Sequence, residues 1–190
     1  MYSTDDEADN VKNLLDKILV IDLESTCWGA DPPPGQEHEI IEIGLCFLDV
    51  ATGERGENPS ILIRPERSTV SEYCTQLTTL TPQEIETGIS LAEACQILRN
   101  EYLSERRIWA SYGDYDRRQF KRQCRERGLD YPFGDSHINV KSLFALTHNL
   151  PQEVGLDQAM ALMGWPLEGV HHRGDDDAWN IARILSDILL

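Results

Sequence analysis

An apolar run near the N-terminus, Ile18 to Ser25 (ILVIDLES), constrains the fold of this chain more than any other segment. Its aliphatic and β-branched residues are typical of a strand buried on both faces of a sheet. Two acids, Asp22 and Glu24, interrupt the run, and because side chains alternate along a strand, both point to the same face. Two like charges about 4 Å apart repel by roughly 4 kcal/mol at an effective dielectric constant near 20. A bound cation would remove that cost, whereas a strand that ended at Ile21 would leave the acids as solvated edge residues.

The segments that follow predict two more strands next to the first in sequence. A loop with three consecutive prolines, which cannot be helical, leads from residue 27 to an apolar strand over residues 39–50 (EIIEIGLCFLDV). A short turn then precedes a third strand, Ser60 to Arg64. Short links between consecutive strands indicate an antiparallel meander.

Beyond Pro65 the pattern predicts helices alternating with two further strands. Thr81-Pro82-Gln83-Glu84 is typical of a helix start, and Ser90 is expected to cap a helix over residues 91–103. The remaining expected elements are a strand over residues 108–112, a helix over 115–127 closed by Gly128, a strand that runs into a helix over 137–148, and amphipathic helices over 155–164 and 175–190. We therefore expect an α/β fold with a five-stranded mixed sheet, a three-strand meander followed by two parallel strands, flanked by helices. Residues 1–17 are expected to be an acidic flexible lead-in, and residues 18–190 a single domain.

Composition narrows the class of protein and of site. The 33 acidic against 17 basic residues give a formal net charge of -16, which disfavours nonspecific nucleic-acid binding through bulk charge. The five cysteines are widely spaced and form no CxxC pair, which argues against both a disulfide framework and a zinc cluster. The N-terminal sequence lacks the basic start and apolar run of a secretory signal, and no long apolar window is present, so we expect a cytoplasmic protein without a membrane partner.

Two later acids stand at the head of apolar helical stripes. Asp116 aligns with Phe120 and Cys124 at i+4 spacing, and Asp177 aligns with a row of isoleucines in the last helix. Each has a plain alternative, because acids are favoured in the first turn of a helix, with Asp114 or Asp175 as the cap. Four carboxylates on separate elements suit hard cations such as magnesium or manganese and disfavour zinc. With His172 as a possible general base near the last helix, the residues indicate metal-dependent phosphoryl chemistry.

Three segments, taken in order, resemble the DEDDh group of 3′–5′ exonucleases, the DnaQ-like branch of the ribonuclease H-like fold. They are DLEST at residues 22–26, SYGDYDRRQF at 111–120 and HRGDDDAWNIARIL at 172–185, and the resemblance covers most of residues 18–189. The motifs DLESTCW, YCTQLTTLT and INVKSLFAL look most like the ERI/histone-mRNA 3′ exonuclease subgroup and its bacterial relatives, which implies RNA as the substrate. A leucine-like residue is usual in that subgroup where Asp175 stands, and Asp177 keeps the five-residue offset from His172.

The resemblance implies a role for each motif residue. Asp22, Glu24 and Asp177 would ligate the first of two divalent cations, Mg²⁺ or Mn²⁺; Asp22 would bridge to the second, and Asp116 would hold the second largely through water. His172 would deprotonate the attacking water, with His171 as the weaker candidate because its register is wrong by one. The product would be a nucleoside 5′-monophosphate released from a free 3′ end of single-stranded nucleic acid.

The resemblance also implies contacts with the terminal nucleotide. We expect backbone and side-chain contacts from Leu23 and Thr26, stacking by Tyr115, and a wedge near Leu77 and Thr78. Both Tyr115 and Leu77 have a structural alternative as core residues. Trp28, in the proline-rich loop, is a looser candidate.

Other functions remain open at this stage. An aspartyl-phosphate phosphatase also begins with an acid pair after an aliphatic strand, but it would leave the His172 and Asp177 motif unexplained. A 3′–5′ exodeoxyribonuclease of DNA proofreading or repair, or a non-catalytic RNA-binding module on the same fold, are the alternatives to an exoribonuclease. Neither the sugar preference nor the oligomeric state follows from the sequence.

Overall fold

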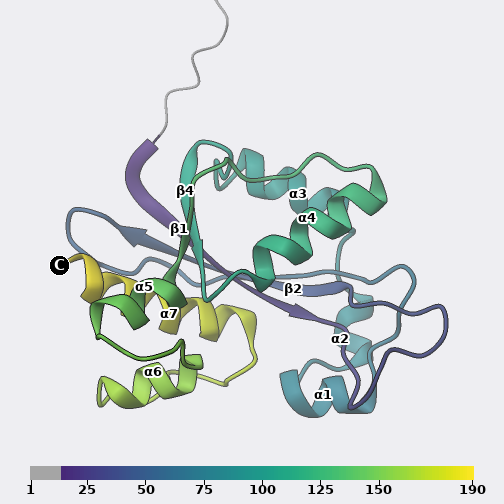
Figure 1. Ribbon diagram of the computed structural model, residues 1–190. Coiled ribbons are helices and arrows are strands. Elements are labelled where there is room, and N and C mark those ends of the chain that lie inside the picture. The colour runs from purple at the N-terminus through teal and green to yellow at the C-terminus, as the bar shows by residue number, and fades with distance from the viewer. Residues whose placement is uncertain (1–13) are drawn as a thin grey trace, which may run out of the picture.

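A computed structural model describes residues 14–190 and contains the predicted five-stranded mixed sheet (Figure 1). The strands lie in the order β3-β2-β1-β4-β5. The meander pairs are antiparallel, and β1 with β4 and β4 with β5 are parallel, as expected. The strands are β1 (Leu14–Ser25), β2 (Ile40–Asp49), β3 (Ser60–Leu62), β4 (Arg107–Ser111) and β5 (His137–Asn139).

The first strand is longer than the sequence predicts. It begins at Leu14, whose backbone pairs with Arg107 of β4, so residues 14–17 are part of the sheet and not of the expected lead-in. Leu15 is 65% exposed, which explains why this end of the strand lacks the continuous apolar run of a buried one. The rest of the expected lead-in lies outside the described residues.

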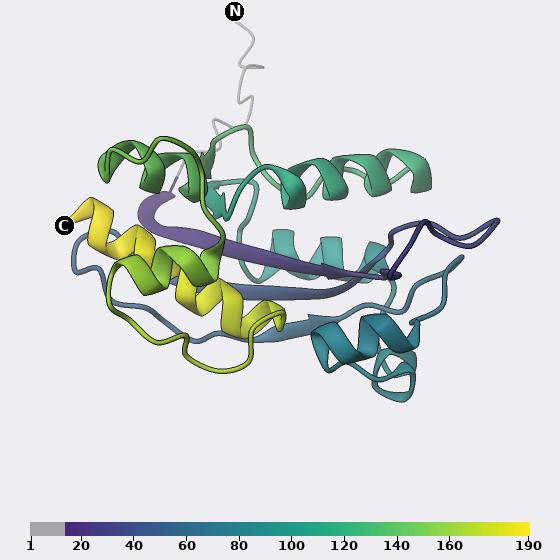
Figure 2. The ribbon, with the colours of Figure 1, turned by 60° about the horizontal axis from the view of Figure 1, so that its bottom comes forward.

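Helices cover both faces of the sheet (Figures 1 and 2). They are α1 (Glu72–Thr78), α2 (Pro82–Glu86), α3 (Leu91–Asn100), α4 (Tyr115–Arg127), α5 (Val140–Thr147), α6 (Leu156–Leu162) and α7 (Gly174–Leu189). In β1, Val20 packs into a core formed with α5, α6 and α7, whereas Leu19 and Ile21 pack into a core formed with α3 and α4. The alternation therefore places Asp22 and Glu24 on the α7 face of the sheet. Among the described residues, no helix is long and apolar enough to cross a bilayer.

Local capping explains where several helices begin and end. Thr81 and Ser90 form capping boxes with Glu84 and Glu93, and Gly128 ends α4 in the left-handed conformation, as predicted. Helix α1 was not predicted. Its N-cap, Ser71, accepts a hydrogen bond from the amide of Cys74. The threonines of α1 have low helix propensity, so the sequence does not show a helical pattern there.

The start of α7 lies directly against the middle of β2. Gly44 of β2 pairs with Asp22 of β1, and a Cβ atom added to Gly44 would lie 1.8 Å from the carbonyl carbon of Gly174. Glycine is therefore required for this backbone-to-backbone approach. The contact fixes the first turn of α7, which carries Asp177, above the acid pair of β1.

We expect Gly44→Ala to destabilise the protein by about 3 kcal/mol, because the added methyl group must displace the start of α7. For a domain of this size, this corresponds to a melting temperature about 6–12 °C lower. Thermal unfolding measures the effect, with Gly56→Ala as the control, since a Cβ there meets its nearest atom at an ordinary 3.4 Å. Equal melting temperatures for the two variants would contradict the close contact.

Candidate active site

Three carboxylates meet above the end of β1. Asp22 and Glu24 come from β1 and Asp177 from the first turn of α7, and their nearest oxygen atoms all lie within 4.8 Å of one another. Glu24 and Asp177 are buried, and Asp22 is half-buried. The strand alternation predicted for the acid pair, and the inward position predicted for Asp177, are both present.

The fourth acid, Asp116, reaches the same place from α4. Its Oδ1 accepts a hydrogen bond of 3.0 Å from the backbone amide of Leu23, the residue between the two acids of β1. The side chain is 4% exposed, and it faces a cavity of about 200 Å³. The cavity is lined by Asp22, Leu23, Glu24, Tyr112, Tyr115, Asp116, Leu156, His171, His172 and Asp177.

Burial and mutual repulsion make the charged forms of these acids unfavourable. Burial, then the charges of Asp177 and other acids, raises the pKa of Glu24 to about 9. Burial raises the pKa of Asp116 to about 7, and burial followed by the Asp116 charge raises that of Asp22 well above its usual value. An all-oxygen donor set that lacks balancing charge fits hard divalent cations such as Mg²⁺ and Mn²⁺.

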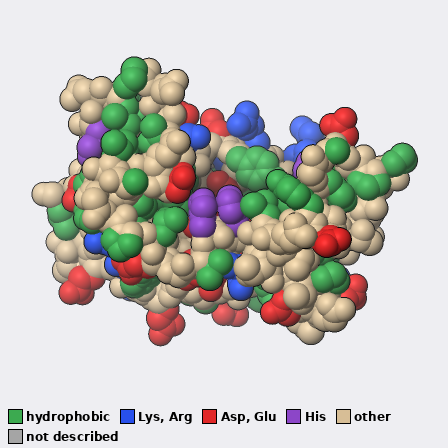
Figure 3. All heavy atoms as spheres, turned by 90° about the horizontal axis from the view of Figure 1, so that it is seen from below, with side chains coloured by type: hydrophobic (Ala, Val, Ile, Leu, Met, Phe, Trp, Pro, Cys, Tyr) green, Lys and Arg blue, Asp and Glu red, His purple; other side chains and the backbone are tan. Residues whose placement is uncertain are grey.

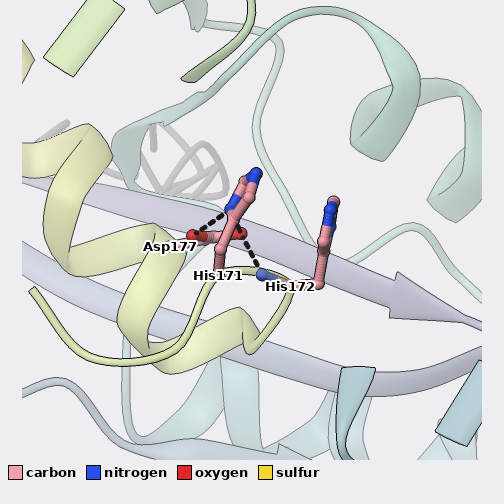
Figure 4. A group of neighbouring side chains, drawn as sticks. All are labelled: His171, His172 and Asp177. Atoms are coloured by element: carbon pink, nitrogen blue, oxygen red, sulfur yellow. Dashed lines mark hydrogen bonds and ion pairs between the residues drawn. The ribbon is translucent and has the colours of Figure 1, made fainter. Parts of the chain in front are cut away.

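Two histidines border the cavity from the segment before α7 (Figure 4). The Nδ1 atom of His171 lies 3.1 Å from both carboxylate oxygens of Asp177, and the backbone amide of His172 donates to Asp177 Oδ2 at 2.9 Å. The two rings are stacked with centroids 4.0 Å apart. Figure 3 shows histidine side chains at the centre of this face, next to hydrophobic side chains.

The structure thus brings His171 as well as His172 to the acids. His171 is the weaker candidate from the sequence, and its contact with Asp177 is not predicted there. His172 adopts a left-handed backbone with φ of 65°, which turns its ring beside that of His171. Burial, then the neighbouring His171, lowers the pKa of His172, which favours the neutral form of its ring.

The residues expected to contact a nucleotide divide into two groups. Leu23 lines the cavity, and Tyr115, which is 48% exposed, does so too. Thr26 is fully buried, and its hydroxyl donates to the Glu37 carbonyl and accepts from the Glu39 amide, so its expected contact with the nucleotide stays a prediction. Thr26 ties the proline-rich loop to the end of β1.

The expected wedge lies on α1, the helix that was not predicted. Thr78 is fully buried, and its hydroxyl donates to the carbonyl of Cys74 one turn earlier, so the wedge expected near Leu77 and Thr78 stays a prediction. Leu77 is half-buried and does not line the cavity. Trp28 is half-buried, with its ring 5.5 Å from that of His38.

Glu42 is a buried acid beside the site that the sequence analysis did not single out. It pairs with Glu24 across the β1–β2 ladder and is completely buried. Its carboxylate accepts from the Gly174 amide at 2.8 Å, from Arg173 at 3.0 Å and from the Ser60 hydroxyl at 2.6 Å. It therefore fixes the segment between the histidines and α7. The available signal was an acid inside an apolar strand, the same one that identified Asp22 and Glu24.

We expect Glu42→Gln to lower the free energy of unfolding by about 2 kcal/mol, because hydrogen bonds to a charged acceptor are lost. Looser placement of the two histidines and Asp177 should lower turnover about 10-fold. Glu168→Gln is the control, since Glu168 accepts from Arg55, Arg183 and the Trp179 indole, none of which lies in the segment between the histidines and α7. Unchanged turnover in a destabilised Glu42→Gln protein would show that Glu42 acts on stability alone.

Comparison with known proteins identifies a family and several relatives of this chain. The family model described as "RNase_T: Exonuclease" matches residues 19–185. Rat 3′-5′ exoribonuclease 1 is 29% identical over 191 residues and human 3′-5′ exoribonuclease 1 is 28% identical; each alignment covers 94% of this chain and 54% of the relative. The chain thus spans about half the length of these curated relatives.

Solved structures with the same arrangement extend the comparison. The nuclease domain of 3′hExo, a DEDDh family member bound to rAMP, superposes with a TM-score of 0.81 at 27% identity, covering 94% of both chains. A 3′-exonuclease solved for the recognition of the histone mRNA stem-loop gives 0.80 at 27% identity, covering 92% of this chain and 81% of the other. These neighbours confirm the predicted ribonuclease H-like exonuclease fold.

Proposed function

Because the chain belongs to the RNase_T exonuclease family, in the DEDDh group, we propose that it is a metal-dependent 3′–5′ exonuclease. It removes nucleotides one at a time from the 3′ end of single-stranded RNA and releases nucleoside 5′-monophosphates. The observation that carries the proposal is the meeting of Asp22, Glu24, Asp116 and Asp177 in one cavity beside two histidines. The non-catalytic RNA-binding module is disfavoured, because no acid of the motif set is missing.

Two divalent cations would be held by the four acids. Asp22, Glu24 and Asp177 suit one cation, since their oxygens converge, and Asp116, whose carboxylate accepts from the Leu23 amide, would help to hold the second. When bound, a pair of such cations activates water and stabilises the leaving oxygen in phosphodiester hydrolysis. They also supply the positive charge that an acidic protein needs at the place where the phosphate binds.

The side chains around the acids have separate tasks. His172 accepts the proton of the attacking water, because it borders the cavity and its lowered pKa favours the neutral ring. His171 holds Asp177 through Nδ1. Leu23 and the exposed ring of Tyr115 contact the terminal nucleotide, and stacking on Tyr115 would accept any base.

RNA is preferred over DNA in this proposal because the rat and human relatives are named exoribonucleases. The exodeoxyribonuclease alternative predicts the reverse order of rates. The cytoplasmic location expected from the sequence stays a prediction.

The proposal is tested by incubating the protein with 5′-labelled single-stranded RNA and DNA of one sequence, each with an open or a blocked 3′ end. With Mg²⁺ or Mn²⁺ we expect a ladder that shrinks from open 3′ ends, faster on RNA, and no reaction in EDTA. Faster loss of DNA would support the deoxyribonuclease. Intact strands of both kinds, bound by folded protein, would favour the RNA-binding module.

Metal binding itself should appear as thermal stabilisation. A cation at 100 times its dissociation constant stabilises the folded state by about 2.7 kcal/mol, which predicts a melting temperature about 5–10 °C higher in Mn²⁺ than in EDTA. The Asp22→Asn protein should lack this increase and, in EDTA, should melt no lower than the wild type, because one of the repelling acids is neutral. An equal increase in both proteins would place the cation elsewhere.

A further inference from the structure

A second cavity borders the active site through Tyr115. It has a volume of about 250 Å³ and lies between the proline-rich loop and α4. Its lining residues are Pro32, Gln36, Glu37, His38, Tyr115, Gln119 and Arg122. Since Tyr115 also lines the cavity of the four acids, the two spaces share one aromatic side chain. A strand whose last nucleotide lies at the acids therefore has a second space directly beside it.

The surfaces of this second cavity suit a flat ring. His38 is exposed, and its ring orientation is fixed because Nδ1 lies 2.7 Å from the Thr26 carbonyl oxygen and the Trp28 ring lies 5.5 Å away. With Tyr115 and Pro32, it offers pre-oriented rings on which a base can stack at small entropic cost.

The polar groups of the cavity are already engaged within the protein. Arg122 donates to Glu37 at 2.9 Å, to Glu126 at 2.7 Å and to Gln119 at 3.1 Å, and the Gln119 amide donates to the His38 carbonyl. The positive charge of Arg122 is thus neutralised, and the cavity is not suited to a phosphate. The free surfaces are the rings, which bind bases without regard to sequence.

We propose that this second cavity binds the base of the penultimate nucleotide, which stacks on His38 while the 3′-terminal nucleotide lies at the four acids. The inference rests on the proposed exonuclease function and adds a second position of substrate recognition. The inference also assigns a role to the proline-rich loop, which places His38 beside α4. The hydrogen bond from Arg122 to Glu37 holds the loop in this position.

The test compares two RNAs of one sequence, intact or without the base at the penultimate position, by kcat/KM of the first cleavage. For the wild type we expect the missing base to lower kcat/KM by about 5- to 150-fold, the effect of one lost stacking contact. His38→Ala should lower the value for intact RNA by a similar factor and show no further loss with the base-free RNA. His38→Phe keeps a ring but not the Nδ1 contact and should retain the wild-type ratio.

His148→Ala is the matched control, because His148 is exposed but lies at the end of α5 against Phe144. It should retain the wild-type rates on both RNAs. A His38→Ala protein that still loses activity with the base-free RNA, or a wild type indifferent to the missing base, would overturn this inference alone. A wild type that shortens neither RNA would overturn the proposed function and, with it, this inference.

Discussion

Replacing Asp22 with asparagine is expected to lower kcat for RNA shortening by about 10³-fold while the protein stays folded. Burial, then the charges of Asp116, Glu24, Asp177 and Glu42, raises the pKa of Asp22 well above its usual value. With Glu24 and Asp177, it would hold the first of the two proposed cations. Asparagine keeps the shape of the side chain but removes the charge that holds a divalent cation.

The measurement is a single-turnover rate on 5′-labelled RNA in Mg²⁺, together with a melting curve of each protein. Asp130→Asn is the control, since Asp130 is exposed beyond the end of α4 and away from the cavity. A folded Asp22→Asn protein that keeps more than a tenth of the wild-type rate would remove Asp22 from the catalytic set.

The second large effect is expected for His172→Asn, with a loss of about 10²–10⁴-fold in kcat and little change in KM. Within residues 14–190 the ring of His172 makes no hydrogen bond to the protein, so it is available to accept a proton from water. Asparagine is chosen because it tolerates the left-handed backbone at this position, where φ is 65°. The variant therefore removes the imidazole ring without changing the backbone conformation at residue 172.

His171→Asn provides the comparison. Its Nδ1 contacts both oxygens of Asp177, so we expect a weaker effect, about 10-fold, expressed mainly as a higher Mn²⁺ requirement. If His171→Asn were the inactive variant and His172→Asn the active one, the proton acceptor would be His171.

Much of the fold follows from the sequence because the decisive patterns are local. The run over residues 18–21 is apolar on both faces, and Gly128 ends α4 as expected. The acids could be recognised because each stands where an apolar residue belongs. Residues 14–17 were not predicted to be in the sheet because the partly exposed end of β1 has no apolar run. Helix α1 was not predicted because its threonines have low helix propensity.

Several parts of the site depend on contacts between distant segments, which a single sequence does not reveal. Glu42 and Arg173 are 131 residues apart, and their pairing follows from the Gly44–Gly174 contact between β2 and α7. The burial of Thr26 depends on the return of the proline-rich loop to Glu37 and Glu39. The approach of His171 to Asp177 likewise depends on the turn at His172.

The central claim is that water, activated among the four acids, attacks the last phosphodiester bond of an open 3′ end. The most direct measurement is the mass of the first mononucleotide released from RNA in water enriched in ¹⁸O. We predict the nucleoside 5′-monophosphate of the 3′-terminal base, with one ¹⁸O atom in its phosphate, and none of it from Asp22→Asn. A nucleoside 3′-phosphate, a cyclic phosphate or a product free of ¹⁸O would contradict the account.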